Sequence, residues 1–180
     1  MNMQRNNENK IFFKMKYTYT MLLVGVLLCI NTCKSTENES IKDKVLNVRY
    51  VDPFIGTGGH GHTYPGATVP FGMLQVSPDN GISEWDWCSG YHYSDSIMIG
   101  FSHLHLSGTG IGDFADIRFM PISKKVNLAK EVTSRDDVPY RSSYSHNKET
   151  ASAGYYSVFL KDHNIKVELT SNLRTAFHKY

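Results

Sequence analysis

The chain has 180 residues and a formal net charge of +2 at pH 7, a size that suits one domain with short appendages. Residues 1–32 hold four basic side chains and one acidic one, so residues 33–180 hold 15 basic against 16 acidic, a net charge of −1. The positive charge therefore belongs to the N-terminal segment, and a nucleic-acid partner has no electrostatic support.

An apolar run follows the basic N-terminal segment at residues 17–30 (YTYTMLLVGVLLCI). It is too short to span a bilayer as a helix and is typical of a signal peptide, with a buried core helix as the alternative. Ile30 lies three residues before Cys33, as in the lipobox of bacterial lipoproteins, although Thr32 stands where Gly, Ala or Ser is usual. We therefore expect residues 1–32 to be a lipoprotein signal peptide, Cys33 to be lipidated and residues 33–44 to be a polar tether. The protein would then be exported and anchored in a membrane by its lipid, facing the periplasm or lying on the cell surface.

From residue 45 onward the hydrophobic pattern predicts strands rather than helices. Residues 162–164 separate two such strands and predict a hairpin turn, and residues 123–153 predict a long loop with one short strand. The class is all-β, and we expect an antiparallel β-sandwich over residues 45–180. The predicted strands are 45–51, 97–101, 113–121, 154–160, 165–170 and 174–180.

The chain stops at the end of the strand predicted over residues 174–180. An unpaired strand edge invites aggregation, which natural domains avoid. We therefore interpret the sandwich as truncated.

Residues 52–116 differ from the rest of the chain, since they hold 12 of the 14 glycines, both tryptophans and five of the eight histidines. Glycine at this density indicates tight turns and close backbone approaches. Within this block, residues 85–93 (WDWCSGYHY) combine flat aromatic rings with hydrogen-bonding groups. This combination suits a sugar, which has apolar C–H faces and a rim of hydroxyls. The candidate sugar contacts are Trp85, Asp86 and Trp87.

Two pairs of histidines are spaced by one residue, so the rings of each pair would share a face if the segment were a strand. Such rings can be metal ligands, with Asp113 or Asp116 as a carboxylate third. The alternative, which we favour, is that they hydrogen-bond backbone or substrate hydroxyls, so no metal site is assigned. The pairs are His60 with His62 and His103 with His105.

Other short patterns do not identify a catalytic group. Residues 108–113 (GTGIGD) lack the Lys-Ser/Thr ending of a phosphate loop, and Asp113 would repel a phosphate, so they predict a structural turn. There is no G-x-S-x-G elbow for a serine nucleophile. Cys88 has no base assignable from the sequence, which favours a packed thiol.

Several long strings together resemble the N-terminal region of the family 92 glycoside hydrolases, the calcium-dependent exo-acting α-mannosidases common in glycan-degrading bacteria. The resemblance covers residues 50–180. The strings are YVDPFIGT (50–57), GHTYPGA (61–67), VPFGM (69–73), WDWCSGY (85–91), GFSHLHLSGTG (100–110), AGYY (153–156) and ELT (168–170).

The resemblance implies a two-domain enzyme in which a β-sandwich precedes an (α/α) helical barrel, with the active site between them. Cleavage would proceed with inversion, by a general acid and a general base. The resemblance places both carboxylates and most of the calcium ligands in the helical domain, which this chain lacks, so no catalytic residue is carried over.

The sandwich side of the pocket can be carried over. The segment of Trp85, Asp86 and Trp87 resembles the one that approaches the mannose, and the two histidine pairs are further candidates on that surface. The chain is therefore interpreted as an N-terminal fragment of an exported α-mannosidase acting on α-1,2 linkages of mannose-rich glycans, inactive alone. The alternatives are a stand-alone carbohydrate-binding lipoprotein, for which loss of glycan binding in Trp87→Ala would be evidence, and a non-functional remnant of a broken gene.

Overall fold

A computed structural model describes residues 47–81, 84–129 and 131–180, all of which belong to one compact unit, residues 46–180. The expected signal peptide, Cys33 and tether lie outside these residues. Within the described part, no helix is long and apolar enough to cross a membrane.

The strand predicted over residues 45–51 is wrong for the residues described. Asn47 and Val48 are helical, and the N–H groups of Tyr50 and Val51 donate to the Asn47 and Val48 carbonyls at 3.1 Å each. These N–H groups are hydrogen-bonded within the segment and not to a neighbouring strand. The partial alternation of apolar and polar residues in this segment therefore does not mark a strand.

One sheet of the sandwich has three antiparallel strands in the order β1-β2-β4. Its register pairs Ala67 with Val76 and Phe101 with Pro78. β3 and β5 form a separate two-stranded antiparallel ladder. The strand bounds are β1 Ala67–Thr68, β2 Gln75–Asp79, β3 Ile97–Met98, β4 Gly100–Ser102 and β5 Ser142–Ser143.

The second sheet has four antiparallel strands in chain order: β6 Glu149–Ser152, β7 Tyr155–Leu160, β8 Ile165–Ser171 and β9 Ala176–Lys179. The three strands predicted from residue 154 onward are confirmed as β7, β8 and β9. The predicted hairpin is confirmed by the turn at residues 161–164. β8 was predictable because its buried residues, Val167 and Leu169, alternate with more exposed ones, whereas β7 buries consecutive residues and is marked by its aromatic and β-branched composition.

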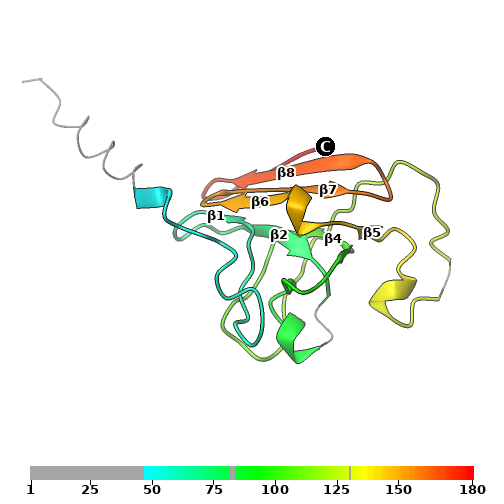
Figure 1. Ribbon diagram of the computed structural model, residues 1–180, viewed down its shortest axis with the longest axis horizontal. Helices are drawn as coiled ribbons and strands as arrows, with labels where there is room; N and C mark the ends of the chain where they lie inside the picture. Colours follow the sequence, from blue (N-terminus) through cyan, green and yellow to red (C-terminus); the bar gives the residue numbers. More distant parts are fainter. Residues whose placement is uncertain (1–46, 82–83, 130) are drawn as a thin grey trace, which may run out of the picture. The chain divides into compact units, whose positions relative to one another are not determined.

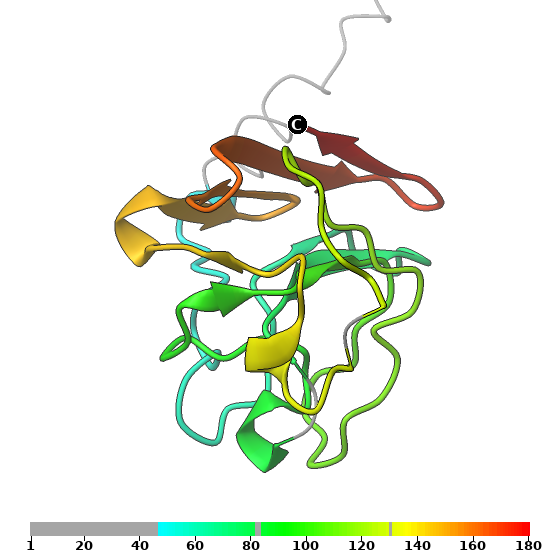
Figure 2. The ribbon, with the colours of Figure 1, turned by 90° about the vertical axis from the view of Figure 1, so that its right-hand side faces the viewer.

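The two sheets pack face to face, with β6 to β9 lying over β1, β2 and β4 (Figures 1 and 2). The core between them is a single cluster of buried side chains from both layers. The all-β antiparallel sandwich is thereby confirmed. The cluster consists of Ala67, Val76, Tyr91, Met98, Phe101, Tyr144, Tyr156, Val158, Leu160, Val167 and Leu169.

Two predicted strands differ from what is observed. The run at residues 97–101 is split at Ile99, whose N–H donates to the Asp79 carbonyl at 2.8 Å, so that β3 pairs with β5 and β4 with β2. The segment 113–121 is irregular, because Phe114, Ala115 and Ile117 have left-handed backbones with φ of 65°, 56° and 55°. Only a bridge between Phe119 and Phe101 is formed there.

The loop predicted over residues 123–153 holds more structure than expected. It contains β5, β6 and two 3-10 turns, η2 Arg135–Asp137 and η3 His146–Lys148. β6 has the sequence ETAS, with no large apolar side chain to mark it as a strand. Its one buried side chain is the carboxylic residue Glu149, which reverses the usual hydrophobic pattern.

Candidate functional site

A cluster of four polar and aromatic side chains forms where the glycine-rich loop meets the 3-10 turn η1, Trp85–Trp87. The Nδ1 atom of His60 lies 2.6 Å from Oδ1 of Asp86, and Nε2 of His62 lies 3.6 Å from the same oxygen. The Trp85 ring contacts both imidazoles, with centroid distances of 5.0 Å to His60 and 4.3 Å to His62. We call these four residues the Asp86 cluster. Two sequence segments about 25 residues apart thus lie together in the fold.

The glycine-rich loop holds its two histidines in place by a tight turn. The Thr63 N–H donates to the Gly56 carbonyl at 3.3 Å. A Cβ at Gly61 would lie 2.0 Å from the same carbonyl oxygen, so only glycine fits there. The next residue, His62, has a left-handed backbone with φ of 54°. This conformation is uncommon for a residue other than glycine and marks a position determined by its surroundings.

The turn at residues 108–110 lies against the other side of the cluster. The Gly108 N–H donates to the His62 carbonyl at 2.8 Å, and Cys88 Sγ donates to the Thr109 carbonyl at 2.8 Å. A Cβ at Gly110 would lie 2.4 Å from Nε1 of Trp85. Gly110 therefore lets the backbone approach the indole closely. The Cys88 thiol is a buried, packed group.

The contacts within the cluster favour an ionised Asp86 carboxylate and leave the Nε2 atom of His62 without a hydrogen bond. The hydrogen bond from His60 is the main cause that lowers the pKa of Asp86 below its usual 3.8. His62 is buried, at 8% exposure, yet its Nε2 has no hydrogen-bond partner within the described residues, because 3.6 Å to Asp86 exceeds hydrogen-bond length. His62 Nε2 is thus a buried polar atom without a hydrogen bond beside the Asp86 carboxylate, in a protein interior where most such atoms have one.

The two tryptophans of η1 have different surroundings. Trp85 is 55% exposed. Trp87 is half-buried: its Nε1 donates to Asp95 at 2.9 Å, and its ring stacks on His92 with centroids 4.3 Å apart. The Arg135 guanidinium lies 5.0 Å from the Trp87 ring and also pairs with Asp95. Trp87 is therefore held in a packed network, and Trp85 is the indole with free surface.

His103 and His105 do not lie in the Asp86 cluster and do not share a face, because β4 ends at Ser102 and the following residues are not a strand. His105 is buried: its Nε2 lies 2.9 Å from Asp79 Oδ1, and its Nδ1 lies 2.7 Å from the Gln75 carbonyl. His103 contacts the Ile117 carbonyl and His178 instead. Both histidines are thus bonded to protein groups away from the Asp86 cluster.

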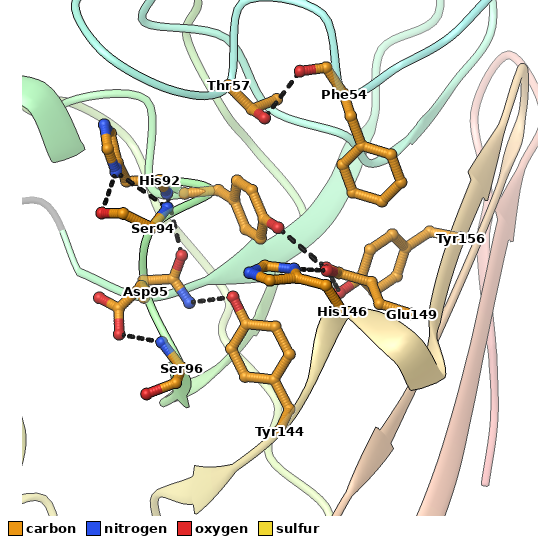
Figure 3. Close-up of polar contacts among 12 residues, drawn as sticks. Phe54, Thr57, His92, Ser94, Asp95, Ser96, Tyr144, His146, Glu149 and Tyr156 are labelled. Atoms are coloured by element: carbon orange, nitrogen blue, oxygen red, sulfur yellow. Dashed lines mark hydrogen bonds and ion pairs between the residues drawn. The ribbon is translucent and has the colours of Figure 1, made fainter.

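A buried carboxyl group at the edge of the second sheet was missed by the sequence reasoning. Glu149 accepts hydrogen bonds from the hydroxyls of Tyr156 at 2.6 Å and Tyr91 at 3.1 Å, and His146 Nδ1 lies 2.6 Å from it (Figure 3). Burial, and then the Glu149 charge, raises the pKa of Tyr156 well above 10, so its hydroxyl stays a donor. This network joins the segment that follows η1 to β6 and β7.

The donor atoms of the described residues do not fit a calcium ion. In the part of the chain that the structure describes, no group of three or more His, Cys, Asp or Glu side chains could hold a metal. Calcium takes six to eight oxygen ligands, whereas the Asp86 cluster offers one carboxylate and two imidazoles.

The fold is that of an antiparallel β-sandwich domain, and the Asp86 cluster places an exposed indole beside a partly exposed carboxylate on it. Residues 50–180 match the family model of the glycosyl hydrolase family 92 N-terminal domain. The chain therefore belongs to this family.

Known relatives agree with this assignment. The α-mannosidase BT3965 of Bacteroides thetaiotaomicron, solved in complex with mannoimidazole, is 46% identical with a TM-score of 0.68, over 73% of this chain and 17% of that one. The inverting mannosidase BT2199 of the same species is 28% identical with a TM-score of 0.51, over 72% of this chain and 17% of that one. An uncharacterized secreted glycosidase of Arthroderma benhamiae is 31% identical over 74% of this chain. The chain spans 17% of the length of these relatives.

Proposed function

We propose that this chain is the N-terminal sandwich of an exported, lipid-anchored α-mannosidase that removes mannose from α-1,2 linkages of mannose-rich glycans with inversion. Family membership supports a glycosidase, and the mannosidase relatives support mannose as the sugar. A secreted relative is consistent with export. The lipid anchor rests on the lipobox-like sequence at Cys33.

The role proposed for the sandwich is to form one wall of the sugar pocket. The observation that carries this is the unpartnered Nε2 of buried His62, which lies beside the Asp86 carboxylate and the exposed Trp85 ring. An indole face packs on the C–H face of a pyranose, a carboxylate accepts from hydroxyls, and an imidazole nitrogen bonds one more hydroxyl. Together these groups match one edge and one face of a mannose ring.

The chemistry is proposed to come from a helical domain outside this chain. Inverting glycosidases use two carboxylic residues on opposite sides of the bond, and the family resemblance assigns both of them to that helical domain. Calcium, by the same resemblance, would be held by that domain. His60, Asp86 and Trp85 would position the sugar, which can change a rate by large factors without taking part in the reaction.

The first test is activity of the purified chain on α-1,2-mannobiose with calcium present. We expect no mannose release, because this proposal assigns the general acid and the general base to the helical domain. Calcium-dependent release above the buffer rate would contradict the proposal.

The second test compares glycan binding by the chain with binding by matched variants. Trp85→Ala and His62→Gln should weaken binding, and His60→Gln should weaken it less, because His60 is mostly exposed and acts through Asp86. Binding that Trp87→Ala alone abolishes, with the fold intact, would instead favour a stand-alone carbohydrate-binding lipoprotein that uses a different surface.

A further inference from the structure

Two histidines far apart in the sequence meet at the free edge of the second sheet. His103 follows the end of β4 and His178 lies in β9, yet their Nε2 atoms are 3.2 Å apart. Their rings are inclined by 29° with centroids 4.8 Å apart, and the Phe119 ring contacts both. Both imidazoles are half-buried.

The other nitrogen of each ring is held by a protein group. His103 Nδ1 lies 2.7 Å from the Ile117 carbonyl, which only accepts, so this nitrogen carries a proton and the Nε2 atom of His103 presents a lone pair. His178 Nδ1 lies 2.9 Å from the Tyr180 hydroxyl, which can donate or accept. In the absence of a ligand, His178 Nε2 therefore donates to His103 Nε2, and Tyr180 donates to His178 Nδ1.

A change of tautomer at His178 lets both imidazoles act as metal ligands. If His178 carries its proton on Nδ1 and donates to Tyr180, both Nε2 atoms present lone pairs. Each ring then donates its Nδ1 proton to an oxygen, the arrangement that orients metal-bound histidines. Two nitrogens about 2.0–2.1 Å from a tetrahedral zinc ion are about 3.3 Å apart, close to the separation already present.

We propose that His103 and His178 bind one transition-metal ion of the zinc class through their two Nε2 atoms, with water in the remaining positions. Imidazole suits Zn²⁺, Cu²⁺ and Ni²⁺ and does not suit Ca²⁺. The site is separate from the proposed calcium chemistry, and it lies on different segments from the Asp86 cluster. It holds two protein ligands, so it is distinct from a closed structural zinc site with four.

The test is a titration of the full 180-residue chain, in detergent micelles at pH 7, with Zn²⁺ and separately with Ca²⁺. Imidazole ¹⁵N signals are recorded during the titration to identify the ligating nitrogens. A competition assay with a zinc chelator measures the affinity. We expect one zinc per chain, large shifts of the Nε2 signals of His103 and His178, and no effect of calcium. His103→Gln and His178→Gln should each weaken zinc binding about tenfold or more, since even outer-sphere changes weaken metal sites by about that factor.

The matched control is His60→Gln, which removes a histidine outside the pair and should leave zinc binding unchanged. Zinc that binds equally well to both pair variants, or that is lost in the control, would overturn the proposal. Should either pair variant fail to fold, the unsubstituted chain decides: Nε2 signals of His103 and His178 that stay in place at saturating zinc would also overturn it.

Discussion

The buried carboxyl network allows a stability prediction from two neighbouring tyrosines. Tyr156 is fully buried and donates to Glu149 at 2.6 Å, whereas Tyr155 on the opposite face of β7 donates to the surface residue Glu168, also at 2.6 Å. The two phenol-to-carboxyl distances are equal, so substitution by Phe removes the same bond in two environments. We expect Tyr156→Phe to destabilise the domain and Tyr155→Phe to have little effect.

The loss in free energy of unfolding depends on which hydrogen-bond partners each carboxyl group keeps after the substitution. A hydrogen bond to a charged group contributes roughly 1.5–3 kcal/mol where water cannot replace it. Glu149 keeps Tyr91 and His146 as partners, so the middle of this range, about 2 kcal/mol, applies to Tyr156→Phe. For a domain of this size, that corresponds to a fall in Tm of about 6–10 °C. Around Glu168, water takes the place of the lost phenol.

The assay is reversible thermal or urea unfolding of both variants, with near-ultraviolet circular dichroism to confirm the native packing. Equal losses in the two variants would refute the reasoning, because they would mean that burial of the acceptor does not set the contribution of the bond. A neutral Tyr156→Phe would refute it as well, since the Glu149 network would then not stabilise the fold.

Three further outcomes are expected. Trp87→Ala should destabilise the domain by about 2–3 kcal/mol in urea unfolding, because it removes a half-buried ring and its bond to Asp95; an unchanged midpoint would contradict this. Gly61→Ala should disrupt the loop at Gly56, seen as lost protection of its amides from hydrogen exchange, because the Cβ would overlap the carbonyl; an unaltered exchange pattern would count against it. The pKa of Tyr156 is raised above its usual 10.0, so its stabilisation is fully present below pH 10 and is lost as the pH rises further; the unfolding midpoint should fall in alkali, and less so in Tyr156→Phe.

The sequence allowed prediction of those parts of the fold where one strand face is buried and the other is not. β8 alternates Ile165, Val167 and Leu169 with polar residues, and it forms as predicted. β2 (QVSPD) was not recognised, because it contains Pro78 and buries Asp79, both unusual in a central strand. The Asp79 carboxylate pairs with Arg118 and His105, which lie later in the sequence.

The candidate site was predictable as a set of residue types and not as a geometry. The sequence indicated Trp85 and Asp86, but it could not distinguish the exposed Trp85 from the packed Trp87, because that depends on Asp95 and Arg135. Residue spacing alone suggested that the two pairs of histidines were alike. The structure shows one pair at Asp86 and the other divided between two environments, since β4 ends before it. Contacts between loops depend on the whole fold and leave no local pattern.

The measurement that tests the central claim most directly is an NMR titration of the ¹⁵N-labelled chain with α-1,2-mannobiose up to about 10 mM, which exceeds the ~1 mM Kd corresponding to about 4 kcal/mol of binding free energy. The signals to follow are the two indole N–H groups and the His62 imidazole. The account predicts saturable shifts of Trp85 and His62, with Trp87 unchanged. Shifts confined to Trp87 or His103, or no shift at any of these groups, would contradict the claim that the Asp86 cluster is a wall of the sugar site.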